Sequence, residues 1–360
     1  MEPYFETSQI SLYQGDCLAV MRSLPSESID CCVTSPPYWG LRDYKTPPQL
    51  WGGNPDCDHE WSDWREVRDI REATSHGKTR TTDRFYGNPS RKFNGNHQKH
   101  FAGSSCSSCG AWLGEFGQEP TLQAYVDHLV EIFAQIHRVL KLTGTAWLNL
   151  GDSFANDEKQ SGLKPKDLCM IPHRCAIALQ DFGWWVRSDV VWAKGNPMPE
   201  SVQDRPTRSH EYIFLLSKSS CYHYDAEAIR EPAQDWGARP NRDEGKSRRI
   251  PGQSPHTGLI DGDFSQRGRN KRSVWRINTT PYPDAHFAVF PPELARICIS
   301  ASCPQDGVVL DPFVGSGTAA FVAKELGRKA IGIDLSSEYL ALAADRCSQL
   351  TIFTPQEATA

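Results

Sequence analysis

Short apolar runs alternate along the chain with longer segments in which apolar residues recur every three or four positions. Between residues 120 and 140, seven apolar side chains fall on one face of a helix, and we expect Gly144 to cap the end of this helix. Runs rich in β-branched and small apolar residues, such as Ile29–Thr34 and Val308–Asp311, are typical of buried strands. Further strands are expected at residues 10–13, 145–150, 184–194, 211–218 and 329–333, and further helices at residues 17–24, 168–182, 318–326 and 337–347. This alternation predicts an α/β fold with a doubly wound, mostly parallel sheet.

Two long stretches break the alternation. Residues 41–116 and 232–276 are polar and rich in Gly, Asn, Ser and Arg, with few aliphatic side chains. A structureless stretch as long as the first is uncommon inside a domain unless it is functional, disordered or tied down. We interpret residues 41–116 as a region inserted into a single catalytic domain that spans residues 1–360.

The inserted region carries metal-binding residue types near its ends. Cys106 and Cys109 form a Cys-x2-Cys pair followed by glycine, which is typical of half a zinc knuckle, and Cys57 with His59 completes a set of four ligands. We therefore expect a structural Zn²⁺ in this region. The Cys-x-His spacing is tight, so three other histidines are rival fourth ligands, and unpaired thiols without a metal are the alternative. The rival histidines are His76, His97 and His100, and the tryptophans expected to pack the knuckle are Trp61, Trp64 and Trp112.

A proline-rich loop follows the strand expected at Ile29–Thr34. In Ser35-Pro36-Pro37-Tyr38, the prolines end the strand because neither has an N–H group to donate to a sheet. The loop offers carbonyl acceptors, a hydroxyl and an aromatic ring, which suit a flat group that carries an NH2, such as a nucleobase. If Ser35 and the Pro36 carbonyl accept the two amine hydrogens, the nitrogen can direct its lone pair at an electrophile while Tyr38 stacks on the base. The alternative is a plain strand exit with a tyrosine in the core.

A second unit lies near the C-terminus. The strand at Val308–Asp311 leads into a glycine turn, and the next strand ends in Asp334, about twenty residues beyond the first glycine. This spacing matches a mononucleotide-binding unit in which the terminal acid binds ribose hydroxyls. No Lys-Ser/Thr pair follows the turn, so it is not a phosphate-binding P-loop. The turn consists of Pro312, Phe313, Val314, Gly315, Ser316, Gly317 and Thr318.

Together, the two motifs resemble those of the amino-methylating DNA methyltransferases. The catalytic motif precedes the cofactor motif, which is the circularly permuted order of the β group in that family. The resemblance implies a Rossmann-like methyltransferase fold, S-adenosyl-L-methionine as the cofactor, and methylation of an exocyclic amine of a base flipped out of duplex DNA. It also implies that Asp16 binds the adenine amine of the cofactor, Phe290 and Pro291 wall its methionine part, Asp311 orders the loop and Asp334 holds the ribose.

Serine at the first position of the catalytic motif usually accompanies cytosine in this family, so we expect N4-methylcytosine as the product. N6-methyladenine is the alternative, because adenine N1 presents an acceptor similar to cytosine N3. Methylation of carbon 5 of cytosine is not expected, since the chain contains no Pro-Cys dipeptide to supply the nucleophile. An amine of protein or RNA remains a further alternative, as do a nicotinamide-dependent oxidoreductase and a non-enzymatic zinc module that binds DNA.

Basic residues between positions 195 and 276 are the expected DNA contacts. Residues 239–276 carry ten Lys or Arg against four Asp or Glu, although such a stretch is often only a solvated loop. In the family, this segment corresponds to the target-recognition region. Asp152, at the end of another expected strand, either lines the pocket or caps a turn. The expected DNA-binding residues are Arg205, Arg208, Arg248, Arg249, Arg267, Arg269, Lys271 and Arg272.

Charge and cysteine usage agree with this interpretation. The net charge of −5 confines any DNA-binding face to a local patch. Twelve scattered cysteines suggest a reducing compartment, and neither a signal peptide nor an apolar run of membrane-spanning length is evident. We expect a cytoplasmic protein that acts on double-stranded DNA, with a separate restriction endonuclease as a possible partner.

Overall fold

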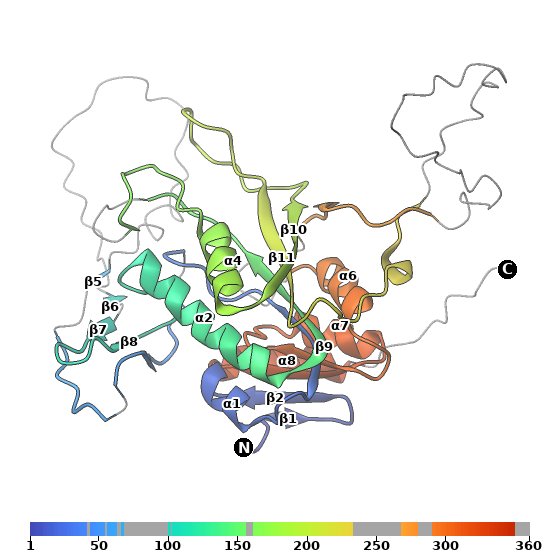
Figure 1. Ribbon diagram of the computed structural model, residues 1–360, viewed down its shortest axis with the longest axis horizontal. Coiled ribbons are helices and arrows are strands. Elements are labelled where there is room, and N and C mark those ends of the chain that lie inside the picture. The colour runs from blue at the N-terminus through green and yellow to red at the C-terminus, as the bar shows by residue number, and fades with distance from the viewer. Residues whose placement is uncertain are drawn as a thin grey trace.

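The computed structural model describes residues 1–41, 44–54, 56–62, 66–67, 100–101, 103–155, 161–232, 268–279 and 290–349. Its central strands are β1 (Phe5–Glu6), β2 (Ile10–Gln14), β3 (Ile29–Thr34), β9 (Leu140–Leu150), β10 (Trp185–Ala193), β11 (His210–Ser217), β12 (Val274–Arg276), β13 (Val308–Asp311) and β14 (Lys329–Asp334). Within the described residues they form one nine-stranded sheet, in the order β1-β2-β14-β13-β3-β9-β11-β10-β12 (Figure 1).

The middle of the sheet is parallel. From β2 through β14, β13 and β3 to β9, each strand pairs in parallel with its neighbour, with Val309 beside Cys31 and Cys32 beside Ala146. β11 runs antiparallel between β9 and β10, and β1 is antiparallel to β2. β12 adds a parallel edge beside β10. The predicted, mostly parallel sheet is confirmed, and antiparallel strands extend it on both sides.

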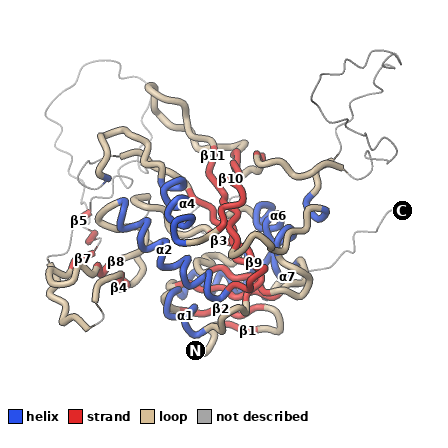
Figure 2. Tube along the Cα trace, in the orientation of Figure 1, coloured by secondary structure: helices blue, strands red, loops and turns tan. Residues whose placement is uncertain are grey.

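Helices cover both faces of the sheet. One face carries α1 (Cys17–Ser23), α2 (Leu122–Val139) and α4 (Ile171–Phe182), and the other carries α6 (Pro292–Ser302), α7 (Thr318–Glu325) and α8 (Ser337–Ser348). Figure 2 shows α1, α2 and α4 in blue on one side of the red central strands, and α6 and α7 on the other. A separate cluster of buried apolar side chains fills the space between the sheet and each helical layer. The fold is therefore doubly wound, as the sequence predicted.

Helix α2 buries its predicted apolar face, but its end differs from the prediction. The helix ends at Val139, Leu140 takes an extended backbone, and the chain continues directly into β9. Gly144 thus lies inside a strand, where an added Cβ would come within 3.1 Å of the Asp30 carbonyl oxygen in β3. The glycine permits this close approach of β3 to β9. The prediction that Gly144 caps the helix was wrong.

The inserted region contributes to the core, which its polar composition did not indicate. Its described residues form a small antiparallel sheet of β4 (Gln49–Trp51), β8 (Trp112–Gly114) and β7 (Gly103–Ser105), and a separate pair of β5 (Glu66–Val67) and β6 (His100–Phe101). Trp51 is 2% exposed and stacks on His128 of α2, with ring centroids 4.9 Å apart. Trp112 stacks on the same imidazole at 5.7 Å. Through these two stacking contacts, the inserted region packs against α2.

None of the helices in the described part of the chain has the length and apolar character needed to cross a membrane.

We predict that Trp51→Ala lowers the free energy of unfolding by about 3–5 kcal/mol, because it leaves a cavity between β4 and α2. Urea denaturation measures this change. Trp185→Ala is the matched control, since Trp185 is 48% exposed on β10, and it should cost less than about 1 kcal/mol. Equal losses in the two variants would contradict the assignment of Trp51 to the core.

Candidate active site

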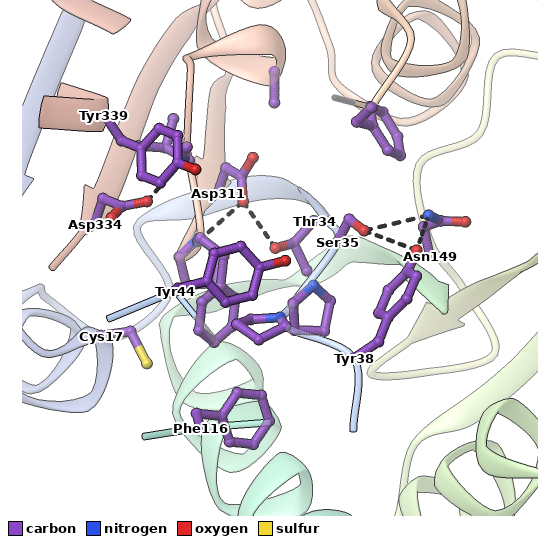
Figure 3. A pocket seen from close by; sticks show the side chains of 18 of the residues that line it. Cys17, Thr34, Ser35, Tyr38, Tyr44, Phe116, Asn149, Asp311, Asp334 and Tyr339 are labelled. Atoms are coloured by element: carbon purple, nitrogen blue, oxygen red, sulfur yellow. Dashed lines mark hydrogen bonds between the residues drawn. The ribbon is translucent and has the colours of Figure 1, made fainter. Parts of the chain in front are cut away.

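The carboxyl ends of the parallel strands meet at one edge of the sheet, and a cavity of about 320 Å³ opens there. Ser35 lies beyond β3, Asn149 near the end of β9, and Asp311 and Asp334 at the ends of β13 and β14. All four side chains line this cavity (Figure 3). The structure therefore brings together the two sequence motifs, although they lie near opposite ends of the chain.

The proline loop is held at several points. The hydroxyl of Tyr125 in α2 donates a hydrogen bond to the carbonyl of Pro37 (2.9 Å). This bond does not involve the carbonyl of Pro36. The indole N–H of Trp39 donates to the Glu119 carbonyl (3.1 Å), and the backbone N–H of Gly40 donates to the Gly117 carbonyl (2.8 Å). Pro36 is buried and lines the cavity with Ser35, Pro37 and Tyr38. The loop is thus fixed against α2 and the exit of the inserted region.

Tyr38 is anchored at its polar end. Its hydroxyl donates to a carboxylate oxygen of Glu211 (2.7 Å), receives the Nδ2–H of Asn149 (2.6 Å) and lies 3.1 Å from the Oγ of Ser35. Burial raises the pKa of this phenol well above its ordinary value, and the charge of Glu211 adds to the effect. The ring lies over Gly151, where a Cβ would come within 2.6 Å of the ring carbon Cε2. Glycine is therefore required at this position for the ring to lie as it does.

Sequence reasoning missed several polar residues of the cavity, among them Asn149, Lys194 and Glu211. Lys194 forms an ion pair with one oxygen of Glu211, and Asn149 donates to the other oxygen (3.0 Å). Lys194 directly follows β10 and Glu211 lies in β11, and no motif gave a signal for this antiparallel pair of strands. Asn149, however, ends a predicted strand, and its position at a strand end could have identified it. Asp152 instead accepts the backbone N–H groups of Ser153 and Ile171, so of the two expected roles it caps a turn.

The second half of the cavity is built on carboxylates. Asp311 accepts the hydroxyl of Thr34 (2.8 Å) and the backbone N–H of Phe313 (3.1 Å). Burial raises the pKa of the Asp311 carboxyl to about 7, despite these two bonds, which favour its charged form. Asp334 accepts the backbone N–H of Gly315 (2.9 Å), and burial raises its pKa as well. The two acids therefore fix the glycine turn from both sides.

The remaining predicted cofactor residues divide into two groups. Some line the cavity: Asp16, Phe290, Pro312, Phe313, Gly315, Ser316 and Thr318. Asp16 also caps α1 by accepting the backbone N–H of Ala19 (2.8 Å). Pro291 and Gly317 do not line the cavity. Pro291 directly precedes α6. Gly317 has a φ of +80° and packs against α8, where an added Cβ would lie 2.9 Å from Ala343. Gly317 thus permits the close packing of the turn on α8.

Comparison with known proteins identifies the family to which these motifs belong. Residues 29–345 match the N6_N4_Mtase family model, which is described as DNA methylase. The chain belongs to this DNA methylase family. The predicted amino-methylating DNA methyltransferase is confirmed, so the oxidoreductase and the non-enzymatic DNA-binding module are set aside.

Related proteins cover nearly the whole methylase. The type II methyltransferase M.XycI of Xanthomonas campestris pv. cyanopsidis is 38% identical over 356 residues, which cover 93% of this chain and 87% of that protein. M.SmaI of Serratia marcescens is 38% identical over 352 residues, covering 92% and 88%. The solved PvuII DNA methyltransferase (cytosine-N4-specific) aligns with a TM-score of 0.59 at 18% identity, over 98% of this chain and 91% of that one. TTHA0409 of Thermus thermophilus, solved with S-adenosyl-L-methionine, aligns with a TM-score of 0.50 at 19% identity, covering 93% and 92%. The predicted methyltransferase fold is thereby confirmed.

Several basic residues expected at the DNA make contacts within the methylase itself. Arg205 pairs with Glu200 (2.6 Å) and lies over the Phe154 ring, and Arg208 donates to the Asp152 carbonyl. Arg269 and Arg272 both pair with Glu231, at 3.1 and 2.9 Å, while Lys271 lies 5.8 Å from the Trp275 ring centroid. Arg248, Arg249 and Arg267 lie outside the described residues.

The four expected metal ligands of the methylase also come together, away from the cavity. The side-chain ligand atoms of Cys57, His59, Cys106 and Cys109 all lie within 4.8 Å of one another. Trp61 lies beside His59, with ring centroids 4.8 Å apart. Trp64, His76 and His97 lie outside the described residues, as does the side chain of His100.

We predict that Gly151→Ala lowers the rate of methyl transfer to DNA by about tenfold or more, because the new methyl group displaces the Tyr38 ring. Single-turnover kinetics with duplex DNA measures the rate. Tyr38→Phe keeps the ring but removes the three polar contacts of the hydroxyl. Comparing the two variants therefore distinguishes the effect of the ring position from the effect of the hydroxyl. A Gly151→Ala enzyme with the wild-type rate would show that the position of Tyr38 does not matter.

We predict that Asp311 makes stability depend on pH. Its folded pKa of about 7 exceeds the ordinary value of 3.8, so the folded protein holds a proton there that the unfolded chain has released. This contribution to stability is lost as pH rises through 7. Relative to Asp311→Asn, the wild type should therefore lose on the order of a few kcal/mol between pH 5 and pH 8. Urea denaturation at both pH values measures the difference, with exposed Asp181→Asn as the control. A gap that does not vary with pH would contradict the raised pKa.

Proposed function

We propose that this methylase transfers a methyl group from S-adenosyl-L-methionine to the exocyclic N4 amine of cytosine in duplex DNA, after the base leaves the helix. The observation that carries the proposal is that the Ser35–Tyr38 loop and the carboxylates Asp311 and Asp334 line one cavity. A nucleotide-binding half and a base-binding half are thus combined in one cavity. N6 of adenine is the second candidate, because family membership covers both amines.

The residues of the turn fit the cofactor. In this proposal, Asp334 binds the ribose hydroxyls, Asp16 the adenine amine and Phe290 the methionine part, and all three line the cavity. The buried Oγ of Ser316 has no hydrogen-bond partner among the described residues, which suits a polar ligand group in this turn. The cofactor supplies a methyl group on a positively charged sulfur. The carboxylates of the cavity provide a negative environment for that charge, and TTHA0409, which shares the fold, was solved with the same cofactor.

The base-binding half fits cytosine better than adenine. In this proposal, Ser35 Oγ and the Pro36 carbonyl accept the amine hydrogens, and both residues line the cavity. Asn149 Nδ2 donates to Ser35 Oγ (3.3 Å), and Lys194 Nζ is joined to the same network through Glu211. Cytosine carries two adjacent acceptors beside its amine, N3 and O2, whereas adenine has N1 followed by a C–H group. The ammonium of Lys194 keeps hydrogens beyond its ion pair with Glu211, so we take it as the donor to this edge of cytosine; the amide hydrogens of Asn149 are already used within the protein.

Glu211 is a positioning residue in this proposal. Its carboxylate binds Tyr38, Asn149 and Lys194 at once, so it holds the stacking ring and both donors in one arrangement. Catalysis follows mainly from alignment of the amine with the methyl group, and no covalent intermediate with the enzyme is needed. Protein and RNA amines are less suited, because the family is one of DNA methylases.

Residues 195–276 are the proposed DNA-contacting region of the single catalytic domain. The β10–β11 hairpin, which contains Arg205 and Arg208, projects from the body of the sheet (Figure 1). Because both arginines already have partners within the chain, binding of a phosphate would exchange one contact for another. Since its substrate is DNA, we place the enzyme in the cytoplasm. The type II relatives suggest a separate restriction endonuclease as its partner.

Analysis of labelled nucleosides tests the proposal. Unmethylated duplex DNA is incubated with the purified protein and methyl-labelled cofactor, then digested and examined by mass spectrometry. The expected product is N4-methylcytosine, and Ser35→Ala should lower its rate by roughly a hundredfold through loss of the amine acceptor. Ser28→Ala is the matched control, because Ser28 is a half-buried serine just before the opposite end of β3 and lies outside the cavity. A sole N6-methyladenine product would overturn the choice of base, and no labelled nucleoside would overturn the activity.

A further inference from the structure

Three thiols and one imidazole converge outside the active-site cavity. The Sγ atoms of Cys57 and Cys106 are 3.9 Å apart, and the Sγ of Cys109 is 3.4 Å from the Nδ1 of His59. In a tetrahedral zinc site with Zn–S distances of about 2.3 Å, neighbouring sulfur atoms are about 3.8 Å apart. These two separations match those of ligands around one ion, and all four ligand atoms lie within 4.8 Å of one another.

The backbone around these residues is built to hold them. The backbone N–H of Cys106 donates to the Ala111 carbonyl (2.7 Å), and that of Gly110, with φ of +75°, donates back to the Cys106 carbonyl (3.0 Å). This tight turn places Cys106 and Cys109 on the same side. Residues 60–62 are joined to it through the bond from Ser107 N–H to the Glu60 carbonyl (2.9 Å). The two halves of the ligand set are thus fastened to each other.

The backbone at Gly53 also passes close to the turn that carries Cys109. At Gly53, which has φ of +79°, an added Cβ would lie 3.0 Å from the Sγ of Cys109 and 2.5 Å from the Cβ of Ala111. Only glycine permits the strand exit after β4 to pass this near to the thiol. The Cys57 N–H then donates to the Asn54 carbonyl (3.1 Å), which directs the chain back toward the cluster.

We propose that Cys57, His59, Cys106 and Cys109 bind one structural Zn²⁺, and that this ion fixes one wall of the active site. Four protein ligands complete a tetrahedral shell, so no position remains for substrate, and none of the four lines the cavity. Thiolate and imidazole ligands in this number select zinc over magnesium or calcium, which prefer oxygen ligands.

The four ligands are linked to the active site by the small sheet of β4, β8 and β7, because they lie in the loops that follow β4 and precede β8. Trp51 of β4 and Phe116 just beyond β8 line the cavity. Phe116 stacks on Phe313 of the cofactor turn, with ring centroids 5.7 Å apart, and on Tyr125 at 5.1 Å. Figure 3 shows Phe116 below the cavity, facing the residues of the two motifs. A zinc ion that holds β4 and β8 in register therefore also holds the ring that supports the cofactor turn.

Metal analysis of the full-length protein tests the proposal without reference to the methylated base. Protein purified without added metal should contain about one zinc per chain by inductively coupled plasma mass spectrometry. The variants Cys57→Ser and Cys106→Ser should lose the zinc. Cys221→Ser is the matched control, because Cys221 is exposed and lies outside the cluster, and it should retain a full complement.

A second measurement covers variants that fail to fold. In the folded wild type, a mercurial thiol reagent should release one zinc per chain to a colorimetric chelator. Removal of the metal should then weaken cofactor binding severalfold in calorimetry, because Phe116 loses its fixed position. Zinc-free wild-type protein after purification with zinc supplied, or an intact mass two hydrogens short from a disulfide, would overturn the site. Zinc binding without any change in cofactor affinity on its removal would overturn the link to the cavity wall.

Discussion

The buried hydrogen bond between the hydroxyl of Thr34 and the carboxylate of Asp311 is the contact on which the site depends. It joins the ends of β3 and β13, two parallel strands whose hydrogen-bonded side chains are 277 residues apart in the sequence. One strand leads into the proline loop and the other into the glycine turn. The bonds from Thr34 and the Phe313 N–H offset part of the cost of burying this carboxyl group. This contact between the ends of β3 and β13 thus sets the distance between the proline loop and the glycine turn.

Both helical layers and the inserted region contact the proline loop, the glycine turn or the cavity between them. Tyr125 of α2 holds the proline loop from one face of the sheet, while Ala343 of α8 packs on the glycine turn from the other. The inserted region reaches the same place through Trp51 and Phe116. A site held from three directions is pre-organised, so binding energy is available for alignment rather than for ordering loops.

The sequence was sufficient for those parts of the fold that depend on local pattern. Strand β3 begins and ends where its β-branched run predicted, and α2 buries the apolar face that its periodicity indicated. Motif spacing brought the proline loop and the glycine turn to one cavity. Gly144 was misjudged because a glycine after a helix and a glycine at a close strand contact look alike in sequence. Lys194 and Glu211 could not be found, since an ion pair across two antiparallel strands leaves no local pattern. The core tryptophans of the insertion were hidden by the polar residues around them.

The order of strands in the sheet also determines when this protein can first become active. During synthesis, β3 leaves the ribosome before β13, the strand with which it pairs. At translation rates of roughly 5–20 residues per second, the separation of 277 residues corresponds to a delay of roughly fifteen seconds to a minute. Until then, the edge of β3 that β13 covers is unpaired and half of the cavity does not exist. A nascent chain that still lacks β13 therefore cannot form the complete site.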